Sequence, residues 1–297
     1  MASSSLVTVL LAAAAALLLP LLYGHAASSA QRALPALRGR RVCLLIAHPD
    51  DEAMFFSPTV LALTRPGAGN HVRILCLSTG DADGLGETRR RELVKSGAVL
   101  GVRDEADVFV IDDKQHFPDS MTATWDADRI ANLLSQTFAP KPDAAADPSI
   151  DVLVTFDARG VSSHPNHVSL YHGARAFVSS LATGSSSSSS STKEASAPPP
   201  VTLYTLRTVG VARKYASIID GILTRVLWSS IGDDGGKKRG ADLLFMSALR
   251  GGEDGQVYGR GFRAMTEAHR SQMRWFRYGW ILLSRYMVVN ELTAENV

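Results

Sequence analysis

Hydrophobic positions along the chain form two patterns: one unbroken apolar run near the amino terminus and, beyond residue 41, short apolar runs that alternate with amphipathic ones. The short runs are rich in β-branched residues and predict strands at residues 42–47, 72–78, 107–111 and 151–156. The amphipathic stretches predict helices around residues 58–64, 88–100, 126–138 and 165–181. Strands that alternate with helices predict an α/β domain with a mostly parallel sheet flanked by helices.

The pattern continues toward the carboxyl terminus but is interrupted twice. It predicts strands at residues 201–207 and 242–247, a helix at 214–227, and a helical stretch at 265–289 that is rich in Arg, Trp, Phe and Tyr. Residues 184–200 are Ser-rich and then Pro-rich, and residues 232–240 read GDDGGKKRG, so both segments are predicted to be flexible insertions. We expect the aromatic side chains of the last helical stretch to pack in the core; the alternative is a surface that contacts anionic lipid headgroups.

The apolar run at residues 6–23 has 18 residues without a charge, which is near the lower limit for spanning a bilayer. Its carboxyl side carries Arg32, Arg38, Arg40 and Arg41 with no acidic residue between them, so the positive-inside rule puts that side in the cytosol. A cleaved signal peptide is the alternative, favoured by small residues at 26–30, but no Lys or Arg precedes the run. We therefore expect an uncleaved transmembrane anchor at residues 1–24, a basic linker at 25–41 and one domain at 42–292.

Composition excludes several classes of protein. The 297 residues include 31 Lys+Arg and 29 Asp+Glu, and 45% are hydrophobic, so a mostly disordered chain is excluded. With a net charge of +2 and no long basic block, we expect no nucleic-acid partner. Cys43 and Cys76 each lie in a predicted strand and are expected to be buried thiols. No Gly-x-Gly-x-x-Gly motif follows the first strand, which excludes a Rossmann dehydrogenase.

Two strand ends carry residues suited to chemistry. The first strand leads into His48-Pro49-Asp50-Asp51-Glu52, at the edge where α/β sheets bind ligands. By itself this string also fits a solvated acidic turn that caps the next helix. The strand at residues 151–156 leads into His164-Pro165-Asn166-His167, where Pro165 fits the first turn of a helix. Residues three apart share one helix face, so both imidazoles can point to one place.

A His and an Asp from one strand end and a His from another make a three-ligand site with an open position, which is typical of catalytic zinc. Zinc bound in this way lowers the pKa of its water to roughly 7. A second carboxylate can then take the proton of that water, and a second imidazole can stabilise the oxyanion or protonate the leaving group. The residues alone leave open which Asp binds metal and which acts as the base.

The two strings resemble the PIG-L/LmbE-like zinc deacetylase family, whose members remove acetyl from N-acetylglucosamine-type amides. Further strings are similar to the eukaryotic members of this family, and the resemblance covers roughly residues 41–292. These strings are Thr155-Phe156-Asp157, residues 86–93, Arg213-Lys214-Tyr215, residues 269–272, Trp275-Phe276-Arg277 and residues 284–287. The resemblance implies a Rossmann-like, LmbE-like fold.

The resemblance also assigns roles to residues. It implies that His48, Asp51 and His167 bind Zn²⁺, with another divalent metal as the alternative. It implies Asp50 as the general base and His164 as the support of the tetrahedral intermediate. Arg89 is a candidate for binding a substrate phosphate, and His269 is a second candidate for substrate binding. Glu52 has no assigned role: it either caps the following helix or orients a ligand.

The expected function is hydrolysis of the acetamide of N-acetylglucosaminyl-phosphatidylinositol, a membrane glycolipid, to glucosaminyl-phosphatidylinositol and acetate. This is an early step of glycosylphosphatidylinositol (GPI) anchor biosynthesis at the endoplasmic reticulum membrane, with the lipid bilayer as partner and the domain in the cytosol. One alternative is the same chemistry on a soluble N-acetylglucosaminide, behind a cleaved signal. A non-catalytic glycolipid-binding module is the alternative from another class. The sequence indicates no particular protein partner.

Overall fold

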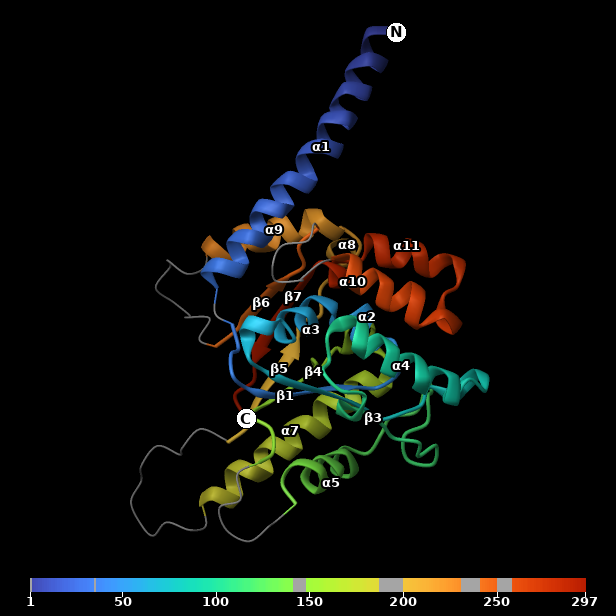
Figure 1. Ribbon diagram of the computed structural model, residues 1–297, viewed down its shortest axis with the longest axis vertical. Coiled ribbons are helices and arrows are strands. Elements are labelled where there is room, and N and C mark those ends of the chain that lie inside the picture. Colours follow the sequence, from blue (N-terminus) through green and yellow to red (C-terminus); the bar gives the residue numbers. More distant parts are fainter. Residues whose placement is uncertain (1, 35, 141–147, 187–199, 231–240, 250–257) are drawn as a thin grey trace.

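Strands and helices alternate along the chain, as the hydrophobic pattern predicts, and build one mixed sheet (Figure 1). The computed structural model describes residues 2–34, 36–140, 148–186, 200–230, 241–249 and 258–297. Within them the sheet has seven strands in the order β3-β2-β1-β4-β5-β7-β6. The strands are β1 (Arg41–Ile46), β2 (His71–Cys76), β3 (Val108–Val110), β4 (Val152–Phe156), β5 (Thr202–Leu206), β6 (Leu243–Met246) and β7 (Val289–Ala294).

The five strands from β3 to β5 run parallel, as expected. Strand β1 pairs with β2 on one side and with β4 on the other, with Val42 opposite both Val72 and Val152. The chain therefore builds outward in two directions from the boundary between β1 and β4. Such a boundary is the topological switch point, where open α/β sheets bind ligands.

Helices cover both faces of the sheet. In Figure 1, α5 (Ala127–Phe138) and α7 (Pro165–Ser186) lie on one side, and α2 (Asp51–Met54), α3 (Ser57–Leu63), α4 (Gly86–Leu100) and α10 (Tyr258–Arg263) lie on the other. The remaining helices are α1 (Ala2–Ala33), α6 (Gly160–Ser163), α8 (Val211–Lys214), α9 (Ser217–Ser230) and α11 (Trp275–Leu283). Short 3-10 turns and one π-helical turn connect these elements; they are η1 (Pro66–Ala68), η2 (Asp81–Asp83), η3 (Glu105–Asp107), η4 (Ala264–Ala268), η5 (Arg270–Gln272) and η6 (Arg285–Met287).

The prediction of one helical stretch over residues 265–289 is wrong in part. The chain there breaks into η4, η5, α11 and η6, and Val289 begins strand β7. Strand β7 is inserted antiparallel between β5 and β6, with Leu206 and Leu243 both opposite Leu292. A strand buried on both faces lacks an alternating pattern, so hydrophobic periodicity does not separate it from a buried helix.

The amino-terminal helix extends further than expected. Helix α1 continues past residue 24 to Ala33, and Tyr23, Ala26, Ala27 and Ala30 are buried in a small core with residues of β6 and β7. Residues 5–33 of this helix are long and apolar enough to cross a membrane. The division into an anchor at 1–24, a linker at 25–41 and a domain at 42–292 stays a prediction.

Several smaller expectations also have outcomes. Both thiols, Cys43 and Cys76, are buried and free, as predicted. Most of each predicted insertion, at 184–200 and 232–240, lies outside the described residues.

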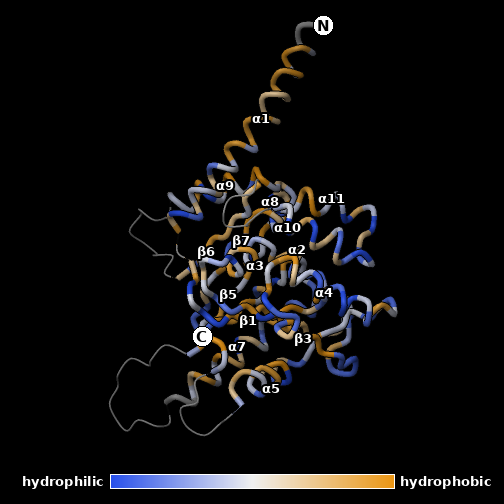
Figure 2. The backbone as a smooth tube through the Cα atoms, in the orientation of Figure 1, coloured by the Kyte–Doolittle hydropathy of each residue, from blue (hydrophilic) through white to orange (hydrophobic). Residues whose placement is uncertain are grey.

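The expectation that the aromatic residues of α11 pack in the core is wrong for Trp275, which is 86% exposed, and for Phe276, which is 54% exposed. Figure 2 shows the mixed hydropathy of this end of the molecule.

Candidate active site

The two sequence motifs meet at the switch point of the sheet. His48 and the acidic turn follow β1, and His164 and His167 follow β4, its parallel neighbour. Because the carboxyl ends of parallel strands lie at the same edge, the pairing of β1 with β4 brings the motifs together. The ring centroids of His48 and His164 are 5.0 Å apart, and those of His48 and His167 are 5.8 Å apart.

Asp51 is oriented by the backbone of its own turn. Its Oδ2 accepts the N–H groups of Ala47 and His48 at 3.0 and 2.9 Å, while its Oδ1 lies 3.3 Å from Nε2 of His167. Burial alone would raise the pKa of Asp51, but the His167 imidazole, His48 and these hydrogen bonds outweigh it and hold the pKa well below its usual range. Asp51 is therefore a buried carboxylate with one oxygen directed to the imidazoles.

His167 is fixed in one tautomer by the loop before it. Its Nδ1 donates to the carbonyl oxygen of Gly160 at 3.1 Å, so Nε2 keeps its lone pair. Gly160 has φ +56°, and a Cβ there would lie 2.9 Å from Cβ of His167, so the loop requires glycine for this close approach. One face of the imidazole stacks on the ring of Phe156, with ring centroids 3.9 Å apart. A hydrogen bond from the second nitrogen is typical of metal-binding histidines.

The tautomer of His48 is set in the same way by Asn166. The Asn166 amide is oriented by two bonds: its Nδ2 donates to Ala123 O at 2.9 Å, and its Oδ1 accepts Ser120 N–H at 3.3 Å. His48 Nε2 therefore donates to Oδ1 of Asn166, at 3.0 Å, which leaves the lone pair on Nδ1. Burial lowers the pKa of His48, so the ring is neutral near pH 7.

His48, Asp51 and His167 fit a divalent metal ion. All three are buried, and one ligand atom from each lies within 4.8 Å of the others. Two neutral imidazole nitrogens and one carboxylate are a donor set that zinc prefers, and a three-residue set leaves a position open. In a second group, His48, Asp119 and His164, one ligand atom from each residue also lies within 4.8 Å of the others. It shares His48 with the first group.

His164 is suited to donating a hydrogen bond. It precedes Pro165, which favours an extended backbone, and its φ and ψ are −66° and 125°. Its Nδ1 accepts the N–H of Asn166 at 3.2 Å, so the proton of the neutral ring lies on Nε2. Burial, His167 and His48 lower the pKa of His164 to about 4.

Asp50 lies in an unusual backbone conformation beside two guanidinium groups. Its φ is +110°, in the region that favours glycine. Its Oδ2 accepts a hydrogen bond from Nη1 of Arg277 in α11 at 2.6 Å and lies 3.8 Å from Nη2 of Arg89. The turn therefore directs Asp50 away from its neighbour Asp51, which faces the imidazoles.

Glu52 supports the backbone of this turn. Its Oε2 accepts the N–H of Asp50 at 3.1 Å, and its Oε1 accepts Ser96 Oγ at 2.5 Å. Nε2 of His269 lies 2.6 Å from the same Oε1, and both side chains are fully buried. Burial alone would lower the pKa of His269, but Glu52 outweighs it and raises the pKa. His269 thus contacts Glu52, the residue that holds the backbone of Asp50.

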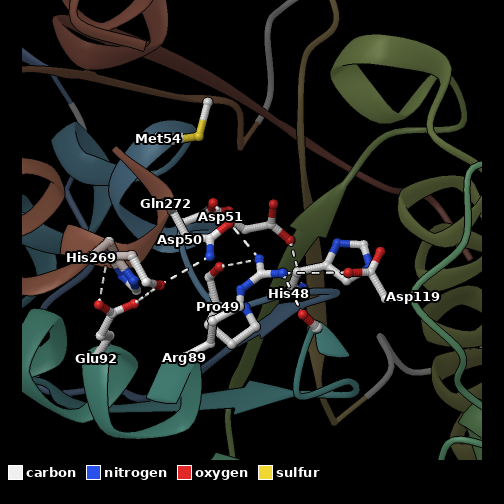
Figure 3. A network of polar contacts seen from close by, with 12 residues as sticks. His48, Pro49, Asp50, Asp51, Met54, Arg89, Glu92, Asp119, His269 and Gln272 are labelled. Carbon is white, nitrogen blue, oxygen red and sulfur yellow. Dashed lines mark hydrogen bonds and ion pairs between the residues drawn. The ribbon is translucent and has the colours of Figure 1, made fainter. Parts of the chain in front are cut away.

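Arg89 holds loops together. It is 8% exposed, and its guanidinium donates to the carbonyl oxygens of Gly80 at 2.6 Å and Pro49 at 2.8 Å (Figure 3). It also donates to Oδ2 of Asp119 at 3.3 Å. These contacts tie three loops at the sheet edge to α4.

The sequence analysis missed Asp119, Asn166 and Arg277 as site residues. Asn166 lies inside the second motif, between the two histidines, but its position there does not mark it as a site residue. Asp119 lies 3.3 Å from Nε2 of His48, on a loop between β3 and α5 that carries no recognisable pattern. Arg277 stands in one of the strings that resemble the family, Trp275-Phe276-Arg277, but the sequence gives it no role. The contact that brings it to Asp50 depends on where α11 packs.

Comparison with known proteins identifies the family of this chain. Residues 43–178 match the PIG-L family model, described as GlcNAc-PI de-N-acetylase, where GlcNAc-PI is N-acetylglucosaminyl-phosphatidylinositol. The chain is 45% identical to the N-acetylglucosaminyl-phosphatidylinositol de-N-acetylase of Arthroderma benhamiae, over 91% of this chain and 92% of the relative. It is 35% identical to the protein of that name from Bos taurus, over 88% of this chain and 86% of the relative. The chain therefore belongs to the PIG-L family of GlcNAc-PI de-N-acetylases.

Proposed function

We propose that this chain hydrolyses the acetamide of GlcNAc-PI to glucosaminyl-phosphatidylinositol and acetate, in GPI-anchor biosynthesis. The observation that carries the proposal is the meeting of His48, Asp51 and His167 with a separate carboxylate, Asp50, and a separate imidazole, His164, at one sheet edge. Relatives that bear this activity in their names match about nine-tenths of the chain. In this proposal Asp51 binds the metal and Asp50 acts as the base, as the family resemblance implies.

The metal that these residues would hold is zinc, through Nδ1 of His48, Oδ1 of Asp51 and Nε2 of His167. When bound, zinc supplies Lewis-acid polarisation and an acidified water. Asp119, next to His48, is proposed to stabilise the proton on Nε2 of that ring together with Asn166. With that proton held on Nε2, His48 would present Nδ1 to the metal.

The residues around this centre perform the proton transfers. Asp50 takes a proton from the attacking water as the water oxygen bonds to the acetamide carbon. His164 donates a hydrogen bond from Nε2 to the developing oxyanion. When the C–N bond breaks, the proton on Asp50 passes to the leaving amine, which gives glucosaminyl-phosphatidylinositol and acetate. Arg277 holds the Asp50 carboxyl group in place through both steps.

We revise the proposed roles of Arg89 and His269. Both were expected to bind substrate, but their contacts favour positioning: Arg89 through Pro49 and Gly80, and His269 through Glu52. Three N–H groups of Arg89 donate to oxygens of Gly80, Pro49 and Asp119, and the side chain is 8% exposed, which favours a positioning role over phosphate binding.

The test separates metal binding from proton transfer. Full-length Asp50→Asn protein is expected to keep its metal and lose most acetate release from GlcNAc-PI in detergent micelles. His48→Ala, Asp51→Ala and His167→Ala are expected to lose the metal as well, measured by elemental analysis. Wild-type activity should disappear with a chelator and return with zinc.

Other outcomes favour the alternatives. Equal metal loss in all four variants would contradict the division of roles. A wild type that is inert on GlcNAc-PI but cleaves a soluble N-acetylglucosaminide would contradict the lipid substrate. A wild type that is inert on both would favour a glycolipid-binding module.

We further propose that the chain is a single-pass protein of the endoplasmic reticulum membrane with its domain in the cytosol. The four arginines between residues 32 and 41 support this orientation. Protease added to intact microsomes is expected to digest the domain without detergent. Protection of the domain until detergent is added would contradict the orientation.

A further inference from the structure

Helix α1 is joined to the domain without a flexible connection. The Tyr23 side chain is fully buried, and its hydroxyl lies 2.7 Å from the carbonyl oxygens of Ser247 and Val288. About two turns further, Gln31 donates to Met246 O at 3.2 Å, and Arg225 of α9 donates to Ser29 at 2.9 Å. These contacts on β6, η6 and α9 fix the direction in which α1 leaves the domain.

The apolar run that α1 extends beyond the domain is short for a bilayer, since the residues before Ser5 are only Ala2, Ser3 and Ser4 in the helix. From Ser5 to Leu22 every residue except Leu19 is exposed, and burial begins at Tyr23. These 18 residues span about 27 Å at 1.5 Å per residue. The hydrocarbon core is about 30 Å thick. A helix of this length that spans the core therefore draws the surface of the domain into contact with the bilayer.

Many exposed side chains at this end of the domain are apolar. Figure 1 shows α8, α9 and α11 along the end from which α1 leaves, and α5 and α7 at the opposite end. The large hydrophobic residues exposed on these three helices are Val211, Ile219, Leu223, Val226, Leu227, Trp275, Phe276, Tyr278, Leu282 and Leu283. We call this set the α8–α11 face. Ser217 Oγ donates to Leu282 O at 3.0 Å, which joins α9 to α11 within the face.

The charges on and beside the face suit a membrane surface. Asp220 is the single acidic residue in the sequences of α8, α9 and α11, and it is buried in a pair with Arg213 and Arg285. Arg270 and Arg274, just before α11, are exposed. Aromatic and aliphatic side chains bordered by arginines are typical of helices that lie in the interface of a bilayer with anionic lipids.

We propose that the α8–α11 face lies in the headgroup layer of the same bilayer that α1 crosses. The inference rests on α1 as a membrane span, which is part of the proposed function. It adds that α11 is an interfacial helix and that the domain has one fixed orientation on the membrane. Because Arg277 of α11 contacts Asp50, this orientation holds the active site at the height of the lipid headgroups.

Site-specific fluorescence tests the proposal on the full chain. Cys43 and Cys76 are buried, so a polarity-sensitive dye can be attached at single introduced cysteines in an otherwise unchanged protein. The positions are Leu223→Cys and Phe276→Cys on the face, Leu11→Cys on α1, and Gln136→Cys on α5 at the opposite end. Each protein is reconstituted into phosphatidylcholine–phosphatidylserine vesicles with and without a lipid that carries a nitroxide quencher on its acyl chain.

We expect quenching by the nitroxide lipid at 223, 276 and 11 and none at 136. If 223 and 276 are quenched no more than 136 while 11 is quenched, the face does not contact lipid and the inference fails alone. If 11 is also not quenched, α1 is not a span and both proposals fail. A blue-shifted but unquenched dye at 276, dependent on the protein-to-lipid ratio, would show that a second protein copy covers the face and would overturn the inference.

Discussion

The turn after β1 gives three adjacent carboxylates three different environments. Asp51 faces the imidazoles, Asp50 faces Arg277, and Glu52 accepts the N–H of Asp50. The different environments of Asp50 and Asp51 could be anticipated, because a chain that turns off a strand separates neighbouring side chains. The role of Glu52 could not, because its partners Ser96 and His269 come from segments distant in the sequence.

Replacing Glu52 with glutamine is expected to slow turnover without removing metal. The glutamine amide has the shape of the carboxylate but lacks its charge. Its NH₂ group would face Ser96 or His269, which also donate, so the side chain that accepts the N–H of Asp50 is disturbed. Comparable changes behind metal ligands cost about 10–100-fold. We expect kcat to fall within that range, with KM for GlcNAc-PI and metal content little changed. Glu92→Gln is the matched control, since Glu92 is also buried but binds Ser271. Equal kcat values for the two variants would contradict a positioning role for Glu52.

The backbone of Asp50 provides a second prediction at this scale. Asp50→Ala and Asp50→Gly both remove the carboxylate and its pair with Arg277, so both are expected to be inactive. They differ in strain, because φ +110° suits glycine and disfavours alanine. We expect Asp50→Gly to be more stable than Asp50→Ala by about 1 kcal/mol. Thermal unfolding of both variants in the same detergent measures the difference, and an Asp50→Ala protein that is equally stable would show that the turn is not strained.

At the scale of elements, the pairing of β1 with β4 was predictable in outline. Parallel strands with alternating helices implied that His48 and His167 end at one edge, and the switch point is where the motifs meet. The insertion of β7 between β5 and β6 was not predictable, because its buried residues, such as Leu292, carry no signal of their sheet partners. The position of α11, and with it the contact of Arg277 to Asp50, depends on that insertion.

The contact between α1 and α9 can be tested at Gly221. A Cβ there would lie 2.7 Å from Cε2 of Tyr23, so Gly221→Ala must displace the Tyr23 ring or α1 itself. We expect the free energy of unfolding to fall by about 1–3 kcal/mol. Gly279 in α11 has no atom within 4 Å of the corresponding Cβ, so Gly279→Ala should raise stability by about 0.5–1 kcal/mol. Thermal unfolding in micelles compares the two, and a Gly221→Ala protein as stable as Gly279→Ala would contradict close packing of α1 on α9.

At the scale of the whole molecule, the anchor and the domain form one continuous body. The sequence predicted a membrane span followed by a domain, because apolar length and the position of arginines are local signals. It did not predict their relative orientation, since Tyr23 is held by Ser247 and Val288, more than 200 residues away. The sequence favoured core packing of the α11 aromatic residues and kept an exposed surface as the alternative. It could not decide between them for the same reason, because exposure depends on what packs over a helix.

A fixed orientation on the membrane has a kinetic consequence. If the α8–α11 face holds the active site at the headgroups, weakening the contact of this face with lipid must slow the reaction on substrate embedded in vesicles. The chemical step itself should be unchanged. Leu223→Ser combined with Phe276→Ser removes two large apolar side chains, and partial burial of each contributes on the order of 1 kcal/mol. We therefore expect roughly a 10-fold or larger loss of kcat/KM on GlcNAc-PI in vesicles.

The same double variant should act normally on a water-soluble, short-chain analogue of GlcNAc-PI, because neither residue contacts the turn at Asp50 or the histidines. Phe109→Ser is the matched control: Phe109 is an exposed aromatic on β3, at the sheet edge opposite β6. An equal loss on both substrates would mean that the substitutions disturb the active site through α11. Unchanged rates on both would mean that α1 alone positions the enzyme, and the height of Asp50 above the bilayer would then have no bearing on turnover.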